Sequence, residues 1–305
     1  MSSHGWLLFA AMSVIWGIPY LLIKISLEGL SVPVLVFART LIGAAVLLPL
    51  ALSRTNLRIV RRYWKPLLAF AFFEIIAAWL LLSDAERHLS SSTTGLLIAG
   101  SPIVAAVLER VTGGTRRLGV PRIVGLGLGL AGVAVLAGPG LTGGSTWPII
   151  EVLMVSACYA IAPLIAARRL ADVPSLPMTA TCLALAALVY AVPAALHRPS
   201  EIPSGRVIAA TVVLAVVCTA LAFVLFFALI REVGPSRAVV FTYVNPAVAL
   251  AAGVIVLGEP LTTWNVAGLA LILAGSALAT RRSPELAECA AGSDIGGDAR
   301  AVRGG

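Results

Sequence analysis

The chain has 305 residues, of which 59% are hydrophobic and only 12% are charged, and its mean hydropathy is +1.00. A soluble domain carries roughly twice that charged fraction, so the composition excludes an ordinary water-soluble domain and favours a protein embedded in lipid. The formal net charge is +8, but a nucleic-acid-binding protein gathers its cations into a patch on a polar domain. Here the cations lie in short loops between apolar runs, so we expect the lipid bilayer, and no nucleic acid, as a partner.

Ten mostly apolar runs, each close to the length of about 17–25 residues that crosses a bilayer, divide the chain. They are expected at residues 6–27, 32–52, 66–83, 90–111, 120–138, 147–167, 177–196, 207–230, 235–257 and 263–280. No Lys or Arg precedes the first run, so we interpret it as a retained span and not as a cleaved signal peptide. The sequence therefore predicts an all-α integral membrane protein with ten transmembrane helices.

The charge of the loops alternates along the chain. Fifteen cations follow the even-numbered spans, whereas the opposite loops hold three, Arg87, Arg198 and Arg206. Because cytoplasmic loops collect Lys and Arg, we expect both termini in the cytoplasm and the protein in the cell (plasma) membrane. Termini on one side require an even number of spans, and ten satisfies this.

An internal repeat is visible in the prolines. Four proline pairs are each separated by 144 residues, namely Pro19 with Pro163, Pro33 with Pro177, Pro49 with Pro193 and Pro102 with Pro246. Each unit holds five spans, and this odd number turns the second unit over in the membrane, which gives two inverted five-helix repeats. We expect the first repeat over residues 1–145, the second over 146–282, and a disordered cytoplasmic tail over 283–305.

Motifs for enzymatic chemistry are absent or weak. The four cysteines follow no disulfide or metal-ligand spacing, and the three histidines do not pair at metal-ligand spacing. There is no Walker A loop, and the G-x-G-x-x-G pattern that ends at Gly132 lies in a membrane span, where small residues serve helix packing. We expect no enzyme activity, no metal and no cofactor. The small-residue face from Gly125 to Gly132 suits either a homodimer or the helix bundle.

Ionisable residues inside the apolar runs are better candidates for function, because a charge at the membrane centre costs at least about 2.5–3.5 kcal/mol. Glu74 lies near the middle of the third run. It is either a counter-charge for the substrate or a proton carrier, or a structural partner for a cation or a polar group of another helix. Lys24 and Arg39 either reach the headgroups or act inside the bundle, and Arg39 favours a buried ion pair with Glu28 or Glu86. Glu74, Lys24 and Arg39 are therefore the coupling candidates.

Two further acidic residues receive structural interpretations. Glu151 lies one turn into the sixth run, where an acid is favoured at a helix N-terminus. Glu259, in Leu-Gly-Glu-Pro-Leu, is interpreted as a loop cap that leads into the tenth span.

Prolines inside the first, fourth, sixth and ninth runs predict kinked helices, and kinks at matching places in two halves point to a midplane binding site. Aromatic residues with one polar atom stand beside them and suit a mainly apolar cavity, although they could instead pack or form an interfacial belt. The candidate substrate-binding residues are Trp16, Tyr20, Glu74, Trp79, Ser101, Tyr159, Tyr243 and Asn245.

Several motifs resemble one known family. Trp16-Gly-Ile-Pro followed by Lys24 and Arg39, the segment from Ser90 to Pro102, and Val244-Asn-Pro-Ala with Leu257-Gly-Glu-Pro-Leu resemble EamA-type proteins of the drug/metabolite transporter superfamily. The resemblance covers roughly residues 5 to 282. It implies ten helices in inverted repeats, a central cavity lined by spans one, three, four, six, eight and nine, and export of small metabolites such as amino acids.

The halves differ at positions that bear on function. The first half has no Leu-Gly-Glu before its last span, and Arg39 corresponds to Leu183. The expected function is a secondary transporter for a small molecule that works by alternating access. A non-transporting membrane scaffold or sensor is the alternative, and a membrane-embedded enzyme would need a cluster of nucleophiles that we do not find.

Overall fold

The computed structural model describes residues 2–51, 53–101, 104, 120–141, 146–234 and 238–280, and these ranges contain helices and no β-strand. Six helical runs in them are long and apolar enough to cross a membrane, namely Ser3–Ser26, Val32–Ala51, Trp64–His88, Trp147–Arg169, Ser175–Leu196 and Gly205–Val233. Shorter apolar helices cover Ile123–Leu136, Asn245–Leu257 and Thr263–Leu278. The chain is therefore an all-α, multi-pass membrane protein.

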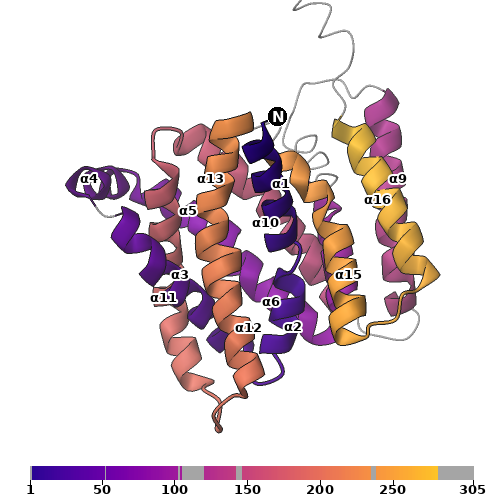
Figure 1. Ribbon diagram of the computed structural model, residues 1–305, viewed down its shortest axis with the longest axis horizontal. Helices are drawn as coiled ribbons and strands as arrows, with labels where there is room; N and C mark the ends of the chain where they lie inside the picture. Colours follow the sequence, from indigo (N-terminus) through magenta and orange to yellow (C-terminus); the bar gives the residue numbers. More distant parts are fainter. Residues whose placement is uncertain are drawn as a thin grey trace, which may run out of the picture.

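The first half forms the helices drawn from indigo to magenta in Figure 1. They are α1 (Ser3–Ile15), α2 (Pro19–Ser26), α3 (Val32–Ala51), α4 (Arg54–Arg62), α5 (Trp64–Ala71), the π-helical segment η1 (Phe72–Ala77), α6 (Ala78–His88), α7 (Ser91–Ile98) and α9 (Val120–Leu141). Most of the second half of the predicted fourth span, and the predicted tail, lie outside the described residues.

The second half follows the same succession. It contains α10 (Trp147–Arg169), α11 (Ser175–Leu196), α12 (Gly205–Ala215), the π-helical segment η2 (Val216–Leu221), α13 (Ala222–Val233), the 3-10 helix η3 (Val239–Tyr243), α15 (Asn245–Leu257) and α16 (Thr263–Thr280). The N-terminus and the end of α16 both lie at the upper end of the bundle in Figure 1.

The observed helices differ from the predicted runs in two places. The third run continues to His88 instead of ending at Ser83, because Asp84, Glu86 and Arg87 extend α6. The basic segment after the second span was predicted as a loop but forms α4, which lies across the direction of the bundle in Figure 1. Its N-cap Ser53 accepts a hydrogen bond from the Asn56 amide at 3.1 Å, which starts the helix despite its charge.

Two π-helical segments occupy equivalent places in the two halves. η1 covers residues 72–77 and η2 covers 216–221, so the two segments are 144 residues apart at both ends. A π-turn leaves a backbone carbonyl without its ordinary partner. In η1 the Ile76 carbonyl accepts from the Tyr190 hydroxyl at 2.7 Å, and at η2 the Leu214 carbonyl accepts from the Thr219 hydroxyl at 2.9 Å. At each π-helical segment a side-chain hydroxyl thus bonds to a backbone carbonyl.

The predicted proline kinks are realised unevenly. The first run breaks at residues 16–18 before Pro19, and the ninth changes from η3 to α15 at Val244, before Pro246. The sixth run, however, passes through Pro163 as one continuous helix, α10. Pro102 lies outside the described residues.

Packing between helices also pairs the halves. α3 packs against α11, α7 against α15 and α9 against α16, so the second, fourth and fifth spans each contact their counterpart. The contact of α2 with α12 is matched by that of α10 with α6, which joins the first span of each half to the third span of the other.

The small-residue face of α9 packs within the chain. A Cβ atom at Gly275 would lie 2.5 Å from the Gly129 nitrogen and 2.6 Å from the Gly125 oxygen, so the two backbones touch. A Cβ at Gly132 would likewise lie 2.8 Å from Ile272. Of the two uses predicted for this face, it serves the helix bundle, where α9 and α16 form the right-hand edge in Figure 1.

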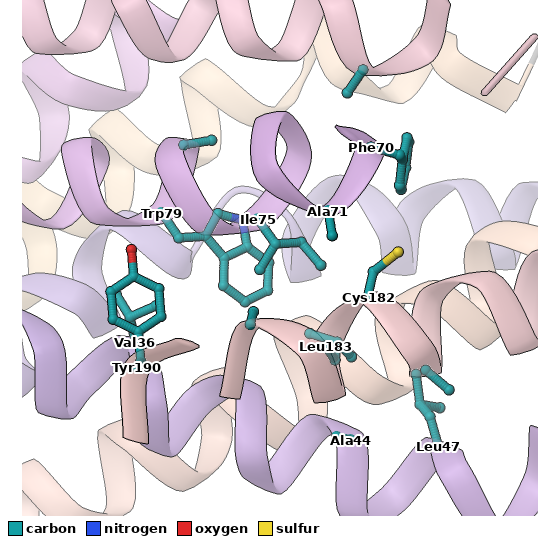
Figure 2. Close-up of a cluster of buried hydrophobic side chains, with 14 of the residues drawn as sticks. Val36, Ala44, Leu47, Phe70, Ala71, Ile75, Trp79, Cys182, Leu183 and Tyr190 are labelled. Atoms are coloured by element: carbon teal, nitrogen blue, oxygen red, sulfur yellow. The ribbon is translucent and has the colours of Figure 1, made fainter. Parts of the chain in front are cut away.

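The largest buried apolar cluster joins the third run to α3 and α11. Figure 2 shows Ile75 and Trp79 pointing from the third run toward Leu183 of α11, while the Tyr190 hydroxyl points back to the third run. This apolar packing fixes the orientation of η1 and α6, which carry several of the candidate residues.

Candidate functional site

Arg39 lies at the centre of a buried polar cluster. Its guanidinium carbon is 3.6 Å from the centroid of the Trp79 ring, and its Nε donates to the Thr219 hydroxyl at 3.0 Å. Only 7% of Arg39 is exposed. A planar guanidinium can stack on an aromatic ring while its edge still donates hydrogen bonds, so α3, α6 and η2 together stabilise this buried cation.

The ion pair predicted for Arg39 does not form among the described residues. Glu28 instead lies 3.7 Å from Arg206 at an exposed position, and Glu86 is an electrostatic neighbour of Arg39 without being bonded to it. In their place, the guanidinium stacks on Trp79 and its Nε donates to Thr219, both of which are neutral groups.

Tyr159 of α10 is an electrostatic neighbour of both Arg39 and Glu74. The indole N–H of Trp79 approaches its hydroxyl. Tyr20 of α2 faces Tyr159 and Arg39. The structure thus brings five of the predicted residues together from the first, second, third and sixth spans.

Glu74 is the acidic residue of this cluster. It lies in the π-helical segment η1 and is half-buried. Its electrostatic neighbours are Tyr159, Cys158 and Cys182, and no cation of the described chain forms an ion pair with it. An intramembrane carboxylate without a protein counter-charge is suited to a cationic group or a proton.

Trp16, Asn245 and Tyr243 form a second region. The Trp16 ring packs against Phe223, Phe226 and Phe241 with centroid distances of 5.8, 5.0 and 5.4 Å. The Asn245 amide nitrogen, in the orientation that suits both neighbours, donates to the Phe241 and Ser13 carbonyls at 3.2 and 3.1 Å. Tyr243 is half-buried at the end of η3. Trp16 and Asn245 hold the broken first span against η3 and α13, away from Arg39.

Ser101 links the fourth span to the sixth. Its hydroxyl lies 2.5 Å from the Ile98 carbonyl, to which it donates, and 3.2 Å from the Ser156 hydroxyl of α10. These contacts satisfy the hydroxyl within the helix bundle.

Lys24 binds the end of a helix. Its Nζ donates to the Glu86 and Leu89 carbonyls at 2.6 and 2.7 Å, which are the last carbonyls of α6. A cation at a helix C-terminus complements the unpaired carbonyls there. Lys24 therefore joins the first span to the third, in contrast to the headgroup contact that snorkelling would give.

The interpretation of Glu259 as a cap for the tenth span is wrong, because its carboxylate caps α7. The backbone amides of Ser91 and Ser92 donate to it at 2.7 and 2.9 Å, and both hydroxyls donate as well. A Cβ at Gly253 would collide with this carboxylate and with the Ser92 hydroxyl, so a glycine is required beside it. We call these four residues, Ser91, Ser92, Gly253 and Glu259, the outer latch, after the outward orientation that the loop charges predict for this end of the bundle.

The outer latch fixes the charge of Glu259. Burial raises the pKa of its carboxyl, but the hydrogen bonds from Ser92 and Ser91 outweigh burial and hold the pKa below its ordinary value. Glu259 is therefore ionised at neutral pH and ties the loop between α15 and α16 to the start of α7.

Two residues of the site were not predicted. No motif in the sequence marks Thr219; it only occupies the position that corresponds to Ile75 in the first half, at the repeat offset of 144 residues. Glu86 was considered only as a partner for Arg39, because it stands in a charged run beyond the predicted end of the third span. Glu151 is 3% exposed and interacts with the half-exposed carboxyl of Asp84, so it has an acidic neighbour besides its place near a helix N-terminus.

Three curated proteins resemble the chain over most of its length. The uncharacterized transporter YvbV of Bacillus subtilis is 27% identical and covers 91% of this chain and 92% of its own. The probable terminal-alkyne amino-acid exporter of Streptantibioticus cattleyicolor is 28% identical, with 88% and 91% covered. The uncharacterized inner membrane transporter YedA of Escherichia coli is 28% identical, with 88% of each chain covered.

A solved crystal structure of a protein shares the fold. It is 22% identical, its TM-score is 0.63, and the match covers 92% of this chain and 98% of that chain.

The sequence profile of the EamA-like transporter family matches the chain twice, over residues 3–138 and 146–281. These two segments cover nearly all of the described helices. The relatives are named as transporters or exporters, and the helices are long and apolar enough to cross a membrane. The chain belongs to the EamA-like transporter family of membrane transporters.

Proposed function

We propose that the protein is a secondary transporter that exports amino acids or related small metabolites by alternating access. The observation that carries this proposal is the cluster of Tyr20, Arg39, Glu74, Trp79 and Tyr159 inside the bundle. A cation, an anion and three aromatic rings surround a short stretch of the membrane interior, which is costly unless it serves a ligand.

The arrangement of charges favours a zwitterionic ligand. Arg39 and Glu74 are both electrostatic neighbours of Tyr159 and form no ion pair with each other in the described residues. A carboxylate could bind at the guanidinium and an ammonium at Glu74, with the side chain of the ligand against the aromatic rings. The name of the Streptantibioticus cattleyicolor relative, a probable exporter of an amino acid, agrees with this class.

We further propose that ten spans form two inverted repeats, with the first over residues 1–145, the second over 146–282, and residues 283–305 as a cytoplasmic tail. The two π-helical segments share the offset of the four proline pairs, and corresponding spans pack together. The family profile also matches once in each half. Both termini are then cytoplasmic, and the halves rock about the cluster to expose it to either side.

Solute counterflow in proteoliposomes tests the proposal. Vesicles loaded with an unlabelled amino acid are expected to take up the labelled form with saturation, in a panel of neutral, acidic and basic amino acids and small organic ions. Glu74→Gln keeps the shape of the side chain but removes its charge, and we expect at least about a tenfold loss of exchange, equivalent to about 1.4 kcal/mol.

A matched control distinguishes a lost site from general damage. Glu201→Gln removes one acid from an exposed loop and should leave exchange unchanged. Equal exchange by E74Q and wild type would remove Glu74 from the site, and no exchange of any solute by the folded wild type would contradict the proposed function.

A further inference from the structure

Glu86 is the most deeply buried acid in the described chain. Its exposed fraction is 0%, and both carboxyl oxygens lack a hydrogen-bond partner among the described residues. It lies in the last turn of α6, close to the outer latch. A buried polar group without a partner is rare in native structures and requires an explanation.

The two neighbouring cations are bound by other groups. Lys24 donates to the Glu86 and Leu89 backbone carbonyls, and Arg39 stacks on Trp79 and donates to Thr219. Neither cation lies within ion-pair distance of the Glu86 carboxyl, although both act on it electrostatically. The carboxyl group therefore faces positive charge without receiving a hydrogen bond from it.

The remaining groups around Glu86 include a negative charge. The ionised Glu259 of the outer latch, in the loop after α15, is an electrostatic neighbour of Glu86. Tyr20 of α2 is an electrostatic neighbour of both Glu86 and Arg39. Asp84, Arg87 and Glu151 interact with one another where α6 meets α10, and none of them is an electrostatic neighbour of Glu86. Lys24, Arg39, Glu259 and Tyr20 are thus the groups that face Glu86.

We propose that Glu86 is a proton-binding site of the transporter, occupied by a proton in the conformation in which the outer latch is closed. An ionised carboxylate here would have lost its hydration and gained no hydrogen bond, whereas a protonated carboxyl loses far less on burial. A metal cation does not fit, because an ammonium and a guanidinium lie beside the site and the described residues hold no cluster of three or more His, Cys, Asp or Glu side chains.

The chemical step is a single proton transfer. A hydronium ion at the outer side gives its proton to the Glu86 carboxylate, which becomes a neutral carboxyl group and leaves a water molecule. When the helices separate from α6 and water enters, the carboxyl returns the proton to water. This role rests on the proposed transport function, since it couples the proton to the movement of the two halves.

Infrared spectroscopy of the full chain in lipid nanodiscs tests the protonation directly. A protonated carboxyl and a carboxylate absorb in separate regions, so the difference between wild type and Glu86→Gln shows which form was lost. At pH 7 we expect E86Q to lose a protonated-acid band, whereas the control E201Q, altered at an exposed loop acid, loses carboxylate bands. Loss of a carboxylate band in E86Q would overturn the proposal.

The stability of E86Q gives a second reading that is free of transport. Glutamine is a neutral isostere of a protonated glutamate, so E86Q should fold and should have the same Tm as the wild type at neutral pH. A variant that fails to fold, or that melts well below wild type, would show that the ionised form is needed and would also overturn the proposal.

Counterflow measured over a range of pH tests the coupling. Exchange by the wild type should change with pH, and exchange by E86Q should lose that dependence, while E201Q keeps it. An unchanged pH profile in E86Q would contradict the coupling role. If the wild type exchanges no solute, the proposed function fails, but the infrared result still decides whether Glu86 holds a proton.

Discussion

Buried charges decide the behaviour of this protein at the scale of single residues. Three charged side chains are each bound by neutral groups. Arg39 contacts an aromatic ring and a hydroxyl, Lys24 donates to two backbone carbonyls, and Glu259 accepts from two backbone amides and two hydroxyls. Glu74 and Glu86 form no ion pair or hydrogen bond in the described chain, which leaves them free to respond to a ligand or a proton.

Arg39→Lys is expected to destabilise the protein although it preserves the charge. An ammonium cannot stack on Trp79 as a planar group and does not reproduce the Nε donor to Thr219. We expect a loss of about 1–3 kcal/mol in the free energy of unfolding, measured as a lower Tm in detergent.

Thr219, which accepts the hydrogen bond from Arg39 Nε, provides the control. In a double-mutant cycle with Thr219→Val, the two losses should be less than additive because the variants remove the same hydrogen bond. Full additivity would mean that Arg39 and Thr219 do not interact.

At the scale of elements, the start of α7 depends on a carboxylate from another part of the chain. Because the folded-state pKa of Glu259 lies below its unfolded value, Glu259 stabilises the fold above the ordinary glutamate pKa. That contribution is lost as the pH falls through the lowered folded-state pKa.

Glu259→Gln should therefore lower the stability at neutral pH by about 1–2 kcal/mol, the usual effect of a helix cap, and should approach wild type in acid. Melting curves of both proteins across pH measure this. A constant difference between them down to strongly acidic pH would contradict an ionised latch.

The contact of α9 with α16 gives a prediction with a matched control. A Cβ at Gly275 would press on backbone atoms of Gly129 and Gly125, which cannot move aside, whereas a Cβ at Gly127 meets nothing within 4 Å. Gly275→Ala should cost about 1–3 kcal/mol, and Gly127→Ala should be neutral or slightly stabilising. Equal melting of the two variants would show that the helices do not pack as described.

Most helices could be predicted from the sequence because each is one continuous apolar run. The π-helical segments could not, since the number of residues in a helical turn leaves no mark on a continuous apolar run. α4 was missed because a rule based on apolar length ignores a charged amphipathic helix. Among the candidate residues, the sequence correctly grouped Tyr20, Arg39, Glu74, Trp79 and Tyr159. The roles of Lys24 and Glu259 could not be predicted, because their hydrogen-bond partners lie 62 and more than 160 residues away in the chain.

At the scale of the whole molecule, we propose that the two halves act as related units that face opposite ways in the membrane. The corresponding spans pack in pairs. The outer latch connects the start of α7, in the first half, to the loop between α15 and α16, in the second half. Near the corresponding place in the first half the sequence reads Thr115-Arg116-Arg117, without a glutamate.

The orientation can be measured with single cysteines after Cys289 is replaced by serine, because Cys158, Cys182 and Cys218 are buried. Ser200→Cys, in the loop between α11 and α12, should react with a membrane-impermeant maleimide on intact cells. Asn56→Cys, in α4, should react only after the cells are permeabilised. The reverse pattern would place the termini outside.

The central claim is that the two halves move relative to each other during transport, and a reversible cross-link between a loop of one half and a loop of the other tests it most directly. A Cβ on Gly29 would lie 3.6 Å from the Pro203 Cβ, so Gly29→Cys with Pro203→Cys places two thiols within disulfide reach. Oxidation of the double variant is expected to stop counterflow and a reducing agent to restore it, while either single variant is insensitive to oxidation. Undiminished counterflow by fully cross-linked protein would contradict alternating access.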